Sequence, residues 1–246
     1  MATIELSVVI PAYNEEHIIE GTIRSIAGYL ASLGLSHEIV VIDDGSADST
    51  SSIVRNLSAE INTLRLCSYT PNKGKGNAVR TGMLFAEGER ILFTDADNST
   101  PIEELPAFIS ALESGCEVAI ASREVEGAVR TVHQPFYREF GGRMLNFFIR
   151  LFAVPGIRDT QCGFKLFTRR AARAIFQQCF INDFSFDVEA LYLARGLGYR
   201  IAEIPVHWAN NPHSAVHPLR DGIALLIDLI RIRLHRYPPA EVERTP

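Results

Sequence analysis

The sequence is short of cysteine and of positive charge, and these shortages exclude several classes of protein. Four of its 246 residues are cysteines, none in a Cys-x-x-Cys pair, so we expect reduced thiols rather than a zinc site or a disulfide framework. Lysine and arginine number 24 against 29 aspartates and glutamates, a formal net charge of −5 that argues against non-specific nucleic-acid binding. The 47% hydrophobic and 22% charged residues exclude a disordered, collagen-like or coiled-coil chain.

Long apolar stretches are missing as well. A helix needs roughly 18–20 apolar residues to cross a bilayer, and the longest candidate, 223–234, is interrupted by Asp228, Arg231 and Arg233. The first residues carry neither a basic nor an apolar stretch, so we expect no signal peptide and a cytoplasmic protein. The two commonest glycine-rich nucleotide-binding motifs, GxGxxG after the first strand and GxxxxGKS/T, are also absent.

Short apolar runs alternate with helical patterns, which is typical of a mostly parallel, doubly wound α/β sheet with flanking helices. The first half predicts strands at 7–10, 38–42, 64–68, 90–94 and 117–121, and helices at 16–33, 48–58, from 76 onward, and 102–113. The second half predicts helices at 137–152, 171–176, 188–195 and 219–236, and a strand at 200–208. We expect one domain over 1–218, followed by an amphipathic helix and a polar tail over 219–246.

Ligands of a doubly wound sheet bind outside the carboxyl ends of its strands, and the first two strands end in polar motifs. After the first strand, Pro11 shapes the exit turn, Tyr13 offers a flat face to a base, and Glu15 or Glu16 offers an acceptor. The alternative is a plain strand–helix loop with a capping asparagine. After the second strand, Asp43 and Asp44 repel each other unless a donor such as a uracil N–H or a guanine edge meets them. The alternative is an Asx turn.

The third and fourth strands are followed by motifs suited to phosphate and metal. The loop NKGKGN (72–77) combines glycines, two lysines including Lys75, and a helix start, which indicates an anion site; the alternative is a solvated basic loop. Asp95 and Asp97 follow the fourth strand at i and i+2, and two such carboxylates can share one Mg²⁺ or Mn²⁺ that completes its shell with substrate phosphates.

Taken in order, SVVIPAYNEE, VVIDDGS, NKGKGNAVRTGM and LFTDADNSTP resemble the family-2 inverting glycosyltransferases, whose nucleotide-sugar fold is called GT-A. Three later segments, SREVEG, RDTQCGFKLF and FSFDVEALYLARGLGYRIAEIPVHW, resemble the polyprenyl-phosphate branch of that family. Within the branch the likeness is greatest to the dolichyl-phosphate β-glucosyltransferases. The resemblance extends from Leu6 to about Arg233.

The resemblance implies roles for residues in a donor half, about 1–122, and an acceptor half, about 123–218. It implies nucleotide-sugar binding by Pro11, Tyr13, Glu15, Asp43, Asp44, Lys75 and Asp95, with Asp44 on the base. It implies a metal ion, Mg²⁺ or Mn²⁺, held by Asp97 together with Asp95. It implies that the acceptor phosphate faces Ser122, Arg123, Arg158 and Lys165.

The chemistry of the acceptor decides what the remaining carboxylates do. A phosphate monoester, with a second pKa of about 6, is already a nucleophile at neutral pH and needs cations rather than a general base. Asp159, Asp187 and Glu189 are then expected to orient the cations, and Arg158 and Asp159 could instead form only a local ion pair. If the acceptor were a sugar hydroxyl, Asp159 or Asp187 would be the expected base.

One position departs from the branch. Its members carry Ser-Lys-Val after the tryptophan strand, whereas this chain has Ser214, Ala215 and Val216. His213, His217 and Arg220 are the candidates to replace the missing lysine, and the identity of the acceptor depends on this replacement.

Two amphipathic segments bear on membrane contact. The segment 143–152 is rich in aromatic and aliphatic residues and flanked by arginines, and 219–236 carries leucines and isoleucines at helical spacing. Both patterns are typical of helices that lie in a membrane interface, and the alternative is packing against the domain or a second subunit.

The sequence thus predicts a metal-dependent inverting transferase that moves glucose from UDP-glucose to a polyprenyl or dolichyl phosphate, giving a β-linked product. It is expected to be peripheral on the cytoplasmic face of a membrane. One alternative is a GDP-mannose-dependent transferase, another is transfer to a hydroxyl of a glycan or glycolipid, and a third is a nucleotide-sugar-binding module without turnover. No oligomeric state is predicted.

Overall fold

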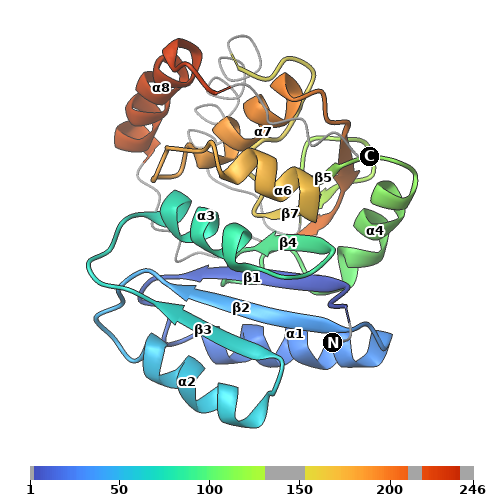
Figure 1. Cartoon of the computed structure of the whole chain (residues 1–246), viewed down its shortest axis with the longest axis vertical. Helices are drawn as coiled ribbons and strands as arrows, with labels where there is room; N and C mark the ends of the chain where they lie inside the picture. The colour runs from blue at the N-terminus through green and yellow to red at the C-terminus, as the bar shows by residue number, and fades with distance from the viewer. Residues whose placement is uncertain (1–2, 131–152, 210–217, 239–246) are drawn as a thin grey trace.

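The computed structural model describes residues 3–130, 153–209 and 218–238. Its centre is a seven-stranded sheet in the order β3-β2-β1-β4-β7-β5-β8 (Figure 1). The strands of this sheet are β1 (Leu6–Ala12), β2 (His37–Asp43), β3 (Leu64–Ser68), β4 (Arg90–Thr94), β5 (Val118–Ser122), β7 (Phe164–Thr168) and β8 (Ile201–Pro205). The helices are α1 (Ile19–Leu33), α2 (Thr50–Glu60), α3 (Lys75–Phe85), a 3-10 turn η1 (Ile102–Glu104), α4 (Leu105–Glu113), α6 (Arg169–Phe176), α7 (Phe186–Gly196) and α8 (Pro218–Leu234).

The predicted α/β sheet is confirmed, with one strand that the sequence reading missed. β7 runs antiparallel to both of its neighbours, β4 and β5, while the other pairings are parallel. Its residues, FKLFT, belong to a segment that was interpreted only as a motif. Because β7 enters the sheet from the opposite direction, its first residues lie at the edge where β4 ends, and Thr94 is paired with Phe164.

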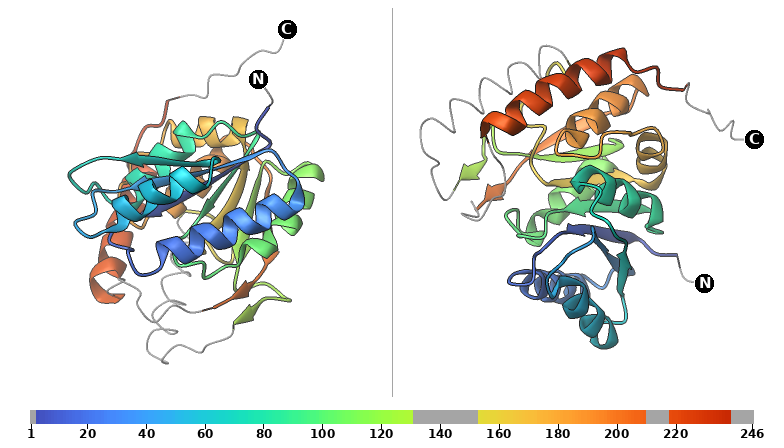
Figure 2. Two further views of the ribbon diagram at one scale, coloured as in Figure 1. Left: turned by 90° about the horizontal axis from the view of Figure 1, so that it is seen from below. Right: turned by 90° about the vertical axis from the view of Figure 1, so that its left-hand side faces the viewer.

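The strands are buried on both faces, which explains their unbroken apolar runs. On β1, Val8 and Ile10 pack with α1, α2 and α4, whereas Val9 packs on the opposite side with α3, α6 and α7. Figure 2 shows these two helical layers, with the blue α1 on one side of the sheet and the orange α7 on the other. The alternation of side chains along each strand therefore builds two cores at once.

The prediction of one strand over 200–208 is wrong in one respect, because this segment forms two strands. β8 ends at Pro205, and β9 (His207–Trp208) leaves the main sheet to pair with β6 (Val129–Arg130). A proline has no N–H for a continuing ladder, which accounts for the break. The small β6–β9 sheet brings Trp208 to the segment that follows β5.

The last helix covers the layer formed by α6 and α7. Leu225, Leu229 and Ile232 of α8 are buried in the core on that side of the sheet. Within the described ranges, no helix combines the length and the apolar character needed to cross a membrane. The predicted helix at 137–152 and the segment 143–152 lie outside the described residues.

Candidate functional site

The carboxyl ends of β1, β2 and β4 meet at one edge of the sheet and deliver the predicted donor-side residues there. Tyr13 follows β1, Asp43 ends β2, and Asp95 follows β4. The start of β7 joins the same edge, because the Asp95 amide donates to the carbonyl of Gly163 at 3.1 Å. A Cβ atom on Gly163 would lie 1.9 Å from Asp95 Oδ2, so only glycine permits this approach.

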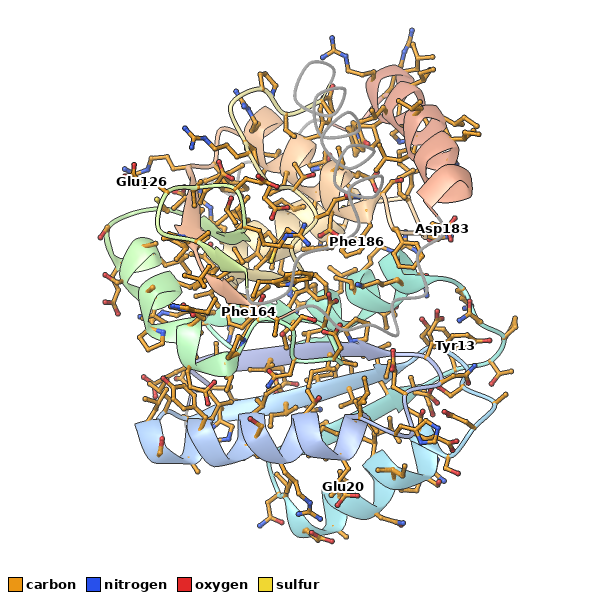
Figure 3. All side chains as sticks on the ribbon, turned by 180° about the vertical axis from the view of Figure 1, so that it is seen from behind. Tyr13, Glu20, Glu126, Phe164, Asp183 and Phe186 are labelled. Carbon is orange, nitrogen blue, oxygen red and sulfur yellow. The ribbon has the colours of Figure 1, made fainter. Side chains whose placement is uncertain are left out.

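The loops after β1 and β2 are bound to each other by side chains. The backbone amide of Asn14 donates to Ser46 Oγ at 2.9 Å, and the backbone amide of Glu15 donates to Thr50 Oγ1 at 2.8 Å. Asn14 has a φ of 56°, a left-handed conformation that asparagine tolerates better than most residues. This turn leaves the Tyr13 side chain exposed at the end of the molecule seen at the right of Figure 3.

The two aspartates at the end of β2 are buried and hold neighbouring loops. The carboxylate oxygens of Asp44 accept the amides of Lys73 at 2.8 Å and Gly74 at 2.9 Å. Asp43 Oδ1 accepts the amide of Ser46 at 3.1 Å. The expected repulsion between the two carboxylates is thus met by backbone donors, and Asp44 fixes the loop that precedes α3.

The glycines of the NKGKGN loop serve packing within the protein. A Cβ on Gly74, whose φ is +97°, would lie 2.5 Å from the Asn182 carbonyl oxygen, and one on Gly76 would lie 2.6 Å from that of Ile181. The backbone amide of Asn77 donates to the backbone carbonyl of Asn182 at 3.2 Å. The glycines therefore let the start of α3 pack closely against the backbone of the segment before α7. The sequence did not predict this contact.

Glu15, Asp95 and Asp97 form an acidic group at the sheet edge. Partial burial, followed by the negative charge of Asp97, raises the pKa of Glu15 to about 7. Lys75 opposes this effect, and its Nζ lies 2.7 Å from Asp95 Oδ1. That oxygen is buried, and Lys75 is its ion-pair partner. The site therefore carries more negative charge than its lysine balances.

A second lysine lies deeper in the same site. Lys165 of β7 is buried, and its Nζ contacts Asp187 Oδ1 of α7 at 2.5 Å and the Cys162 carbonyl at 2.7 Å. The ring of Phe93 lies beneath both lysines, 5.8 Å from Lys75 Nζ and 5.7 Å from Lys165 Nζ. Burial raises the pKa of Asp187, and the two lysines offset only part of that rise. Acidic and basic side chains thus alternate in the site, from Asp95 to Lys75 and on to Asp187 and Lys165.

Arg123, directly after β5, is held in a fixed orientation. Its Nε and Nη2 donate to the two carboxylate oxygens of Asp159 at 2.7 and 2.9 Å. Burial alone would raise the pKa of Asp159, but the Arg123 guanidinium, the Arg123 backbone amide and Lys165 together lower it. The guanidinium also lies 5.1 Å from the ring centroid of Trp208, a contact that the sequence interpretation did not assign.

Glu203 of β8 positions the turn that carries Asp159. Its carboxylate accepts the Arg158 amide at 2.9 Å and the Asp159 amide at 3.0 Å. The Arg158 side chain is exposed, so Asp159 is paired with Arg123 rather than with its sequence neighbour. A single glutamate in a short strand carries no motif, which is why sequence reasoning missed Glu203.

Ser122 and Glu189 complete the placement of the predicted residues. Ser122 is buried at the end of β5, and the amide of Glu124 donates to its hydroxyl at 3.4 Å. Glu189 accepts the amide of Ile181 at 2.9 Å and the Tyr237 hydroxyl at 3.0 Å. Its carboxylate is therefore bound to the segment before α7 and to the residues that directly follow α8. His213, Ala215 and His217 lie outside the described residues, and the Arg220 side chain is not described.

Within the described ranges, no cluster of three acidic, histidine or cysteine side chains forms a ready metal centre. A Mg²⁺ or Mn²⁺ ion needs only one or two protein carboxylates when substrate phosphates supply further ligands. The acidic group of Glu15, Asp95 and Asp97 fits a site of that kind, and the charge of Asp97 adds to the larger effect of burial in raising the pKa of Glu15.

A family model described as glycosyl transferase family 2 matches residues 7–176. The dolichyl-phosphate beta-glucosyltransferase of Dictyostelium discoideum is 36% identical over 243 residues, covering 94% of this chain and 74% of that protein. The enzyme of the same name from Mus musculus is 36% identical over 245 residues, covering 94% of this chain and 76% of that protein.

Solved structures share the fold. Glucosyl-3-phosphoglycerate synthase from Mycobacterium tuberculosis, in complex with Mn²⁺ and UDP-glucose, matches with a TM-score of 0.65 and 22% identity over 92% of this chain and 78% of that chain. The mannosyltransferase PcManGT from Pyrobaculum calidifontis, in complex with GDP-Man and Mn²⁺, matches with a TM-score of 0.65 and 25% identity over 97% of this chain and 67% of that chain.

Proposed function

The chain belongs to glycosyl transferase family 2, and from this premise we propose that it transfers glucose from UDP-glucose to a polyprenyl or dolichyl phosphate. The product would be a β-linked lipid-phosphate sugar. The family confirms the predicted GT-A fold and the prediction of a glycosyltransferase. Two relatives of 36% identity, which cover 94% of the chain, are named for the proposed activity.

The observation that carries the proposal is that an acidic group and a set of fixed cations share one sheet edge. Asp95 pairs with Lys75, and the Phe93 ring lies beneath both Lys75 and Lys165. Such an edge suits two anionic substrates, because the cations hold the phosphates together. We propose that residues of about 1–122 bind the donor and residues of about 123–218 the acceptor.

Asp97 and Asp95 would hold a divalent ion that stabilises the negative charge developing on the departing UDP. Within the described residues, Asp97 Oδ1 accepts the nearby Ser99 amide at 3.0 Å, and a carboxylate with one accepted bond still has lone pairs for a metal ion. The raised pKa of Glu15 supports the same assignment, since a cation beside Asp97 would relieve the repulsion.

On the acceptor side, Arg123 is the residue we propose to orient the lipid phosphate, with Lys165, Arg158 and Ser122 around it. The two side-chain bonds from Arg123 to Asp159 use Nε and Nη2, so within the described residues Nη1 is the guanidinium nitrogen left for a phosphate oxygen. A phosphate dianion attacks the sugar carbon without losing a proton, so the reaction needs no general base. Asp159 and Asp187 then act by fixing Arg123 and Lys165.

A lipid acceptor requires the protein to reach a membrane, and we propose that it acts as a peripheral enzyme on the cytoplasmic face. A second candidate uses GDP-mannose, because a mannosyltransferase of 25% identity was solved with GDP-Man.

The test is transfer of label into an organic phase. Protein is incubated with a short polyprenyl phosphate and Mg²⁺ or Mn²⁺, with labelled UDP-glucose and GDP-mannose in separate tubes. We expect label from UDP-glucose, lost with EDTA and reduced roughly 100-fold or more by Asp97→Ala. Glu103→Ala, an exposed carboxylate elsewhere, should transfer normally. Label from GDP-mannose alone would establish the second candidate, and transfer only to a soluble glycan would overturn the lipid acceptor.

A further inference from the structure

One face of α8 is a row of large aliphatic side chains that no other described part of the chain covers. We define the α8 apolar row as Ile223, Leu226, Ile227, Ile230 and Leu234, which are between 39% and 76% exposed. They fall at positions i, i+3, i+4, i+7 and i+11, so they lie along one side of the helix. Isolated exposed leucines are ordinary, but a contiguous aliphatic row marks a contact surface.

The opposite side of α8 is fixed to the protein. Leu225, Leu229 and Ile232 are buried in the core beneath the helix, and Asp228 is buried beside them. The row therefore cannot turn inward without removing this packed side. Nor can the helix enter a bilayer as a span, because half of its circumference is already occupied by the core.

Arginines lie along both margins of the row. With about 3.6 residues per turn, Arg231 projects on one side of Ile230 and Arg233 on the other. Both side chains are exposed, as is Arg236 just beyond the helix. The one acidic side chain described on the helix, Asp228, is buried and paired with Arg231 at 2.9 Å. The exposed part of α8 is thus apolar and cationic in a chain whose net charge is −5.

We infer that α8 docks on the surface of an anionic lipid bilayer, with its apolar row in the interface and its arginines on lipid phosphates. An aliphatic row with long cationic side chains at its margins matches the two layers of such a surface, acyl chains below and anionic headgroups above. A second copy fits less well, because pairing two such helices would bring arginines together with no exposed carboxylate described on either helix to meet them.

The place of α8 in the molecule suits this role. The helix lies at the end toward which β1 runs, where Figure 3 labels Tyr13 and Asp183 (Figures 1 and 3). Beyond its last turn, the Tyr237 hydroxyl donates to Glu189, and His235 packs on Phe180 with ring centroids 4.3 Å apart. A bilayer at α8 would therefore lie beside the sheet edge that holds the site. This benefit to catalysis rests on the proposed function, whereas the docking itself does not.

The test is flotation of the full chain with vesicles of phosphatidylcholine, with and without phosphatidylglycerol, in the absence of sugar nucleotide and polyprenyl phosphate. We expect binding to the anionic vesicles. Ile230→Asp should lower the partition coefficient about tenfold or more. Arg233→Gln should lower it about fivefold on anionic vesicles only. Leu33→Asp, an equal change of charge at an exposed leucine of α1, should leave it within twofold of wild type.

Three results would overturn the docking. They are no binding of the wild type to anionic vesicles, equal losses for Ile230→Asp and Leu33→Asp, or a wild-type dimer in sedimentation that Ile230→Asp separates. Unfolding curves of each variant confirm that the comparison is between folded proteins. A water-soluble short-chain prenyl phosphate separates docking from chemistry, because Ile230→Asp should use it like the wild type. If no protein transfers glucose at all, the proposed function fails while the vesicle result still stands.

Discussion

At the scale of single residues, the pKa of Glu15 responds to burial and to the charges around it in the site. Burial first, and then the carboxylate of Asp97, raises its pKa from an ordinary 4.5 to about 7. In the unfolded chain the same group ionises at its ordinary pKa, so between these values the folded protein binds more protons than the unfolded one. Stability contributed by this group is therefore present at low pH and is lost as the pH rises through about 7.

The sign of this linkage predicts the behaviour of Glu15→Gln in metal-free buffer. The amide cannot ionise, so the variant should melt about 2–4 °C above wild type at pH 8, the shift expected for roughly 1 kcal/mol after solvent screening. At pH 5, where Glu15 is protonated in the folded protein, the difference should be small. Calorimetry at the two pH values measures it, with the exposed Glu126→Gln as control. An equal shift at both pH values would contradict the assignment.

The ion pairs on the acceptor side show how far single residues could be predicted. Asp187 was expected to orient a cation, and it contacts Lys165. The partner of Arg123 could not be read from sequence, because Asp159 lies 36 positions away and reaches it only when β7 brings its preceding loop to the edge of β4. Arg158, next to Asp159 in the chain, was an equally reasonable partner and is exposed instead.

At the scale of elements, β8 supports the acceptor side. Glu203 in this strand accepts the amides of Arg158 and Asp159, while Glu117, directly before β5, accepts the amide of Arg200 at 2.8 Å. The two glutamates make the same kind of contact with the backbone. Only Glu203 holds the turn whose aspartate fixes Arg123.

This difference predicts the effect of Glu203→Gln. Losing a charge-assisted acceptor should loosen the Asp159 turn and raise the KM for polyprenyl phosphate about threefold to tenfold, with the KM for UDP-glucose unchanged. Glu117→Gln, the matched change at the other glutamate, should leave both constants unchanged. Steady-state kinetics with each substrate varied in turn supplies the measurement. A rise in both constants for Glu203→Gln would show a general loss of structure rather than positioning.

Elements were predictable where the chain alternates and not where it reverses. The strands at 64–68 and 90–94 lie where the apolar runs place them, because buried parallel strands leave that pattern. β7 carries an equally short run, FKLFT, but nothing local distinguishes a strand that enters the sheet antiparallel between two distant partners. The glycines at 74 and 76 looked like a phosphate loop, and their contact with Asn182 depends on a segment about a hundred residues later.

At the scale of the whole molecule, one sheet edge joins the two halves of the chain. The acidic group follows β1 and β4, the fixed cations follow β5 and lie in β7, and Phe93 lies beneath the lysines of both halves. Sequence order alone predicted that strand ends carry the site, since parallel strands must end on the same side. The contact between the halves could not be predicted in this way, because it depends on the pairing register of β4 with β7.

The central claim is that these halves divide the work, donor on the acidic side and acceptor phosphate on Arg123. The most direct test measures the KM for polyprenyl phosphate and the Kd for UDP in Arg123→Lys, which keeps a cation beside the buried Asp159 but removes the planar fork. The account predicts that the KM for polyprenyl phosphate rises about tenfold while the Kd for UDP stays within twofold of wild type. Equal weakening of both, or weakening of UDP alone, would contradict it.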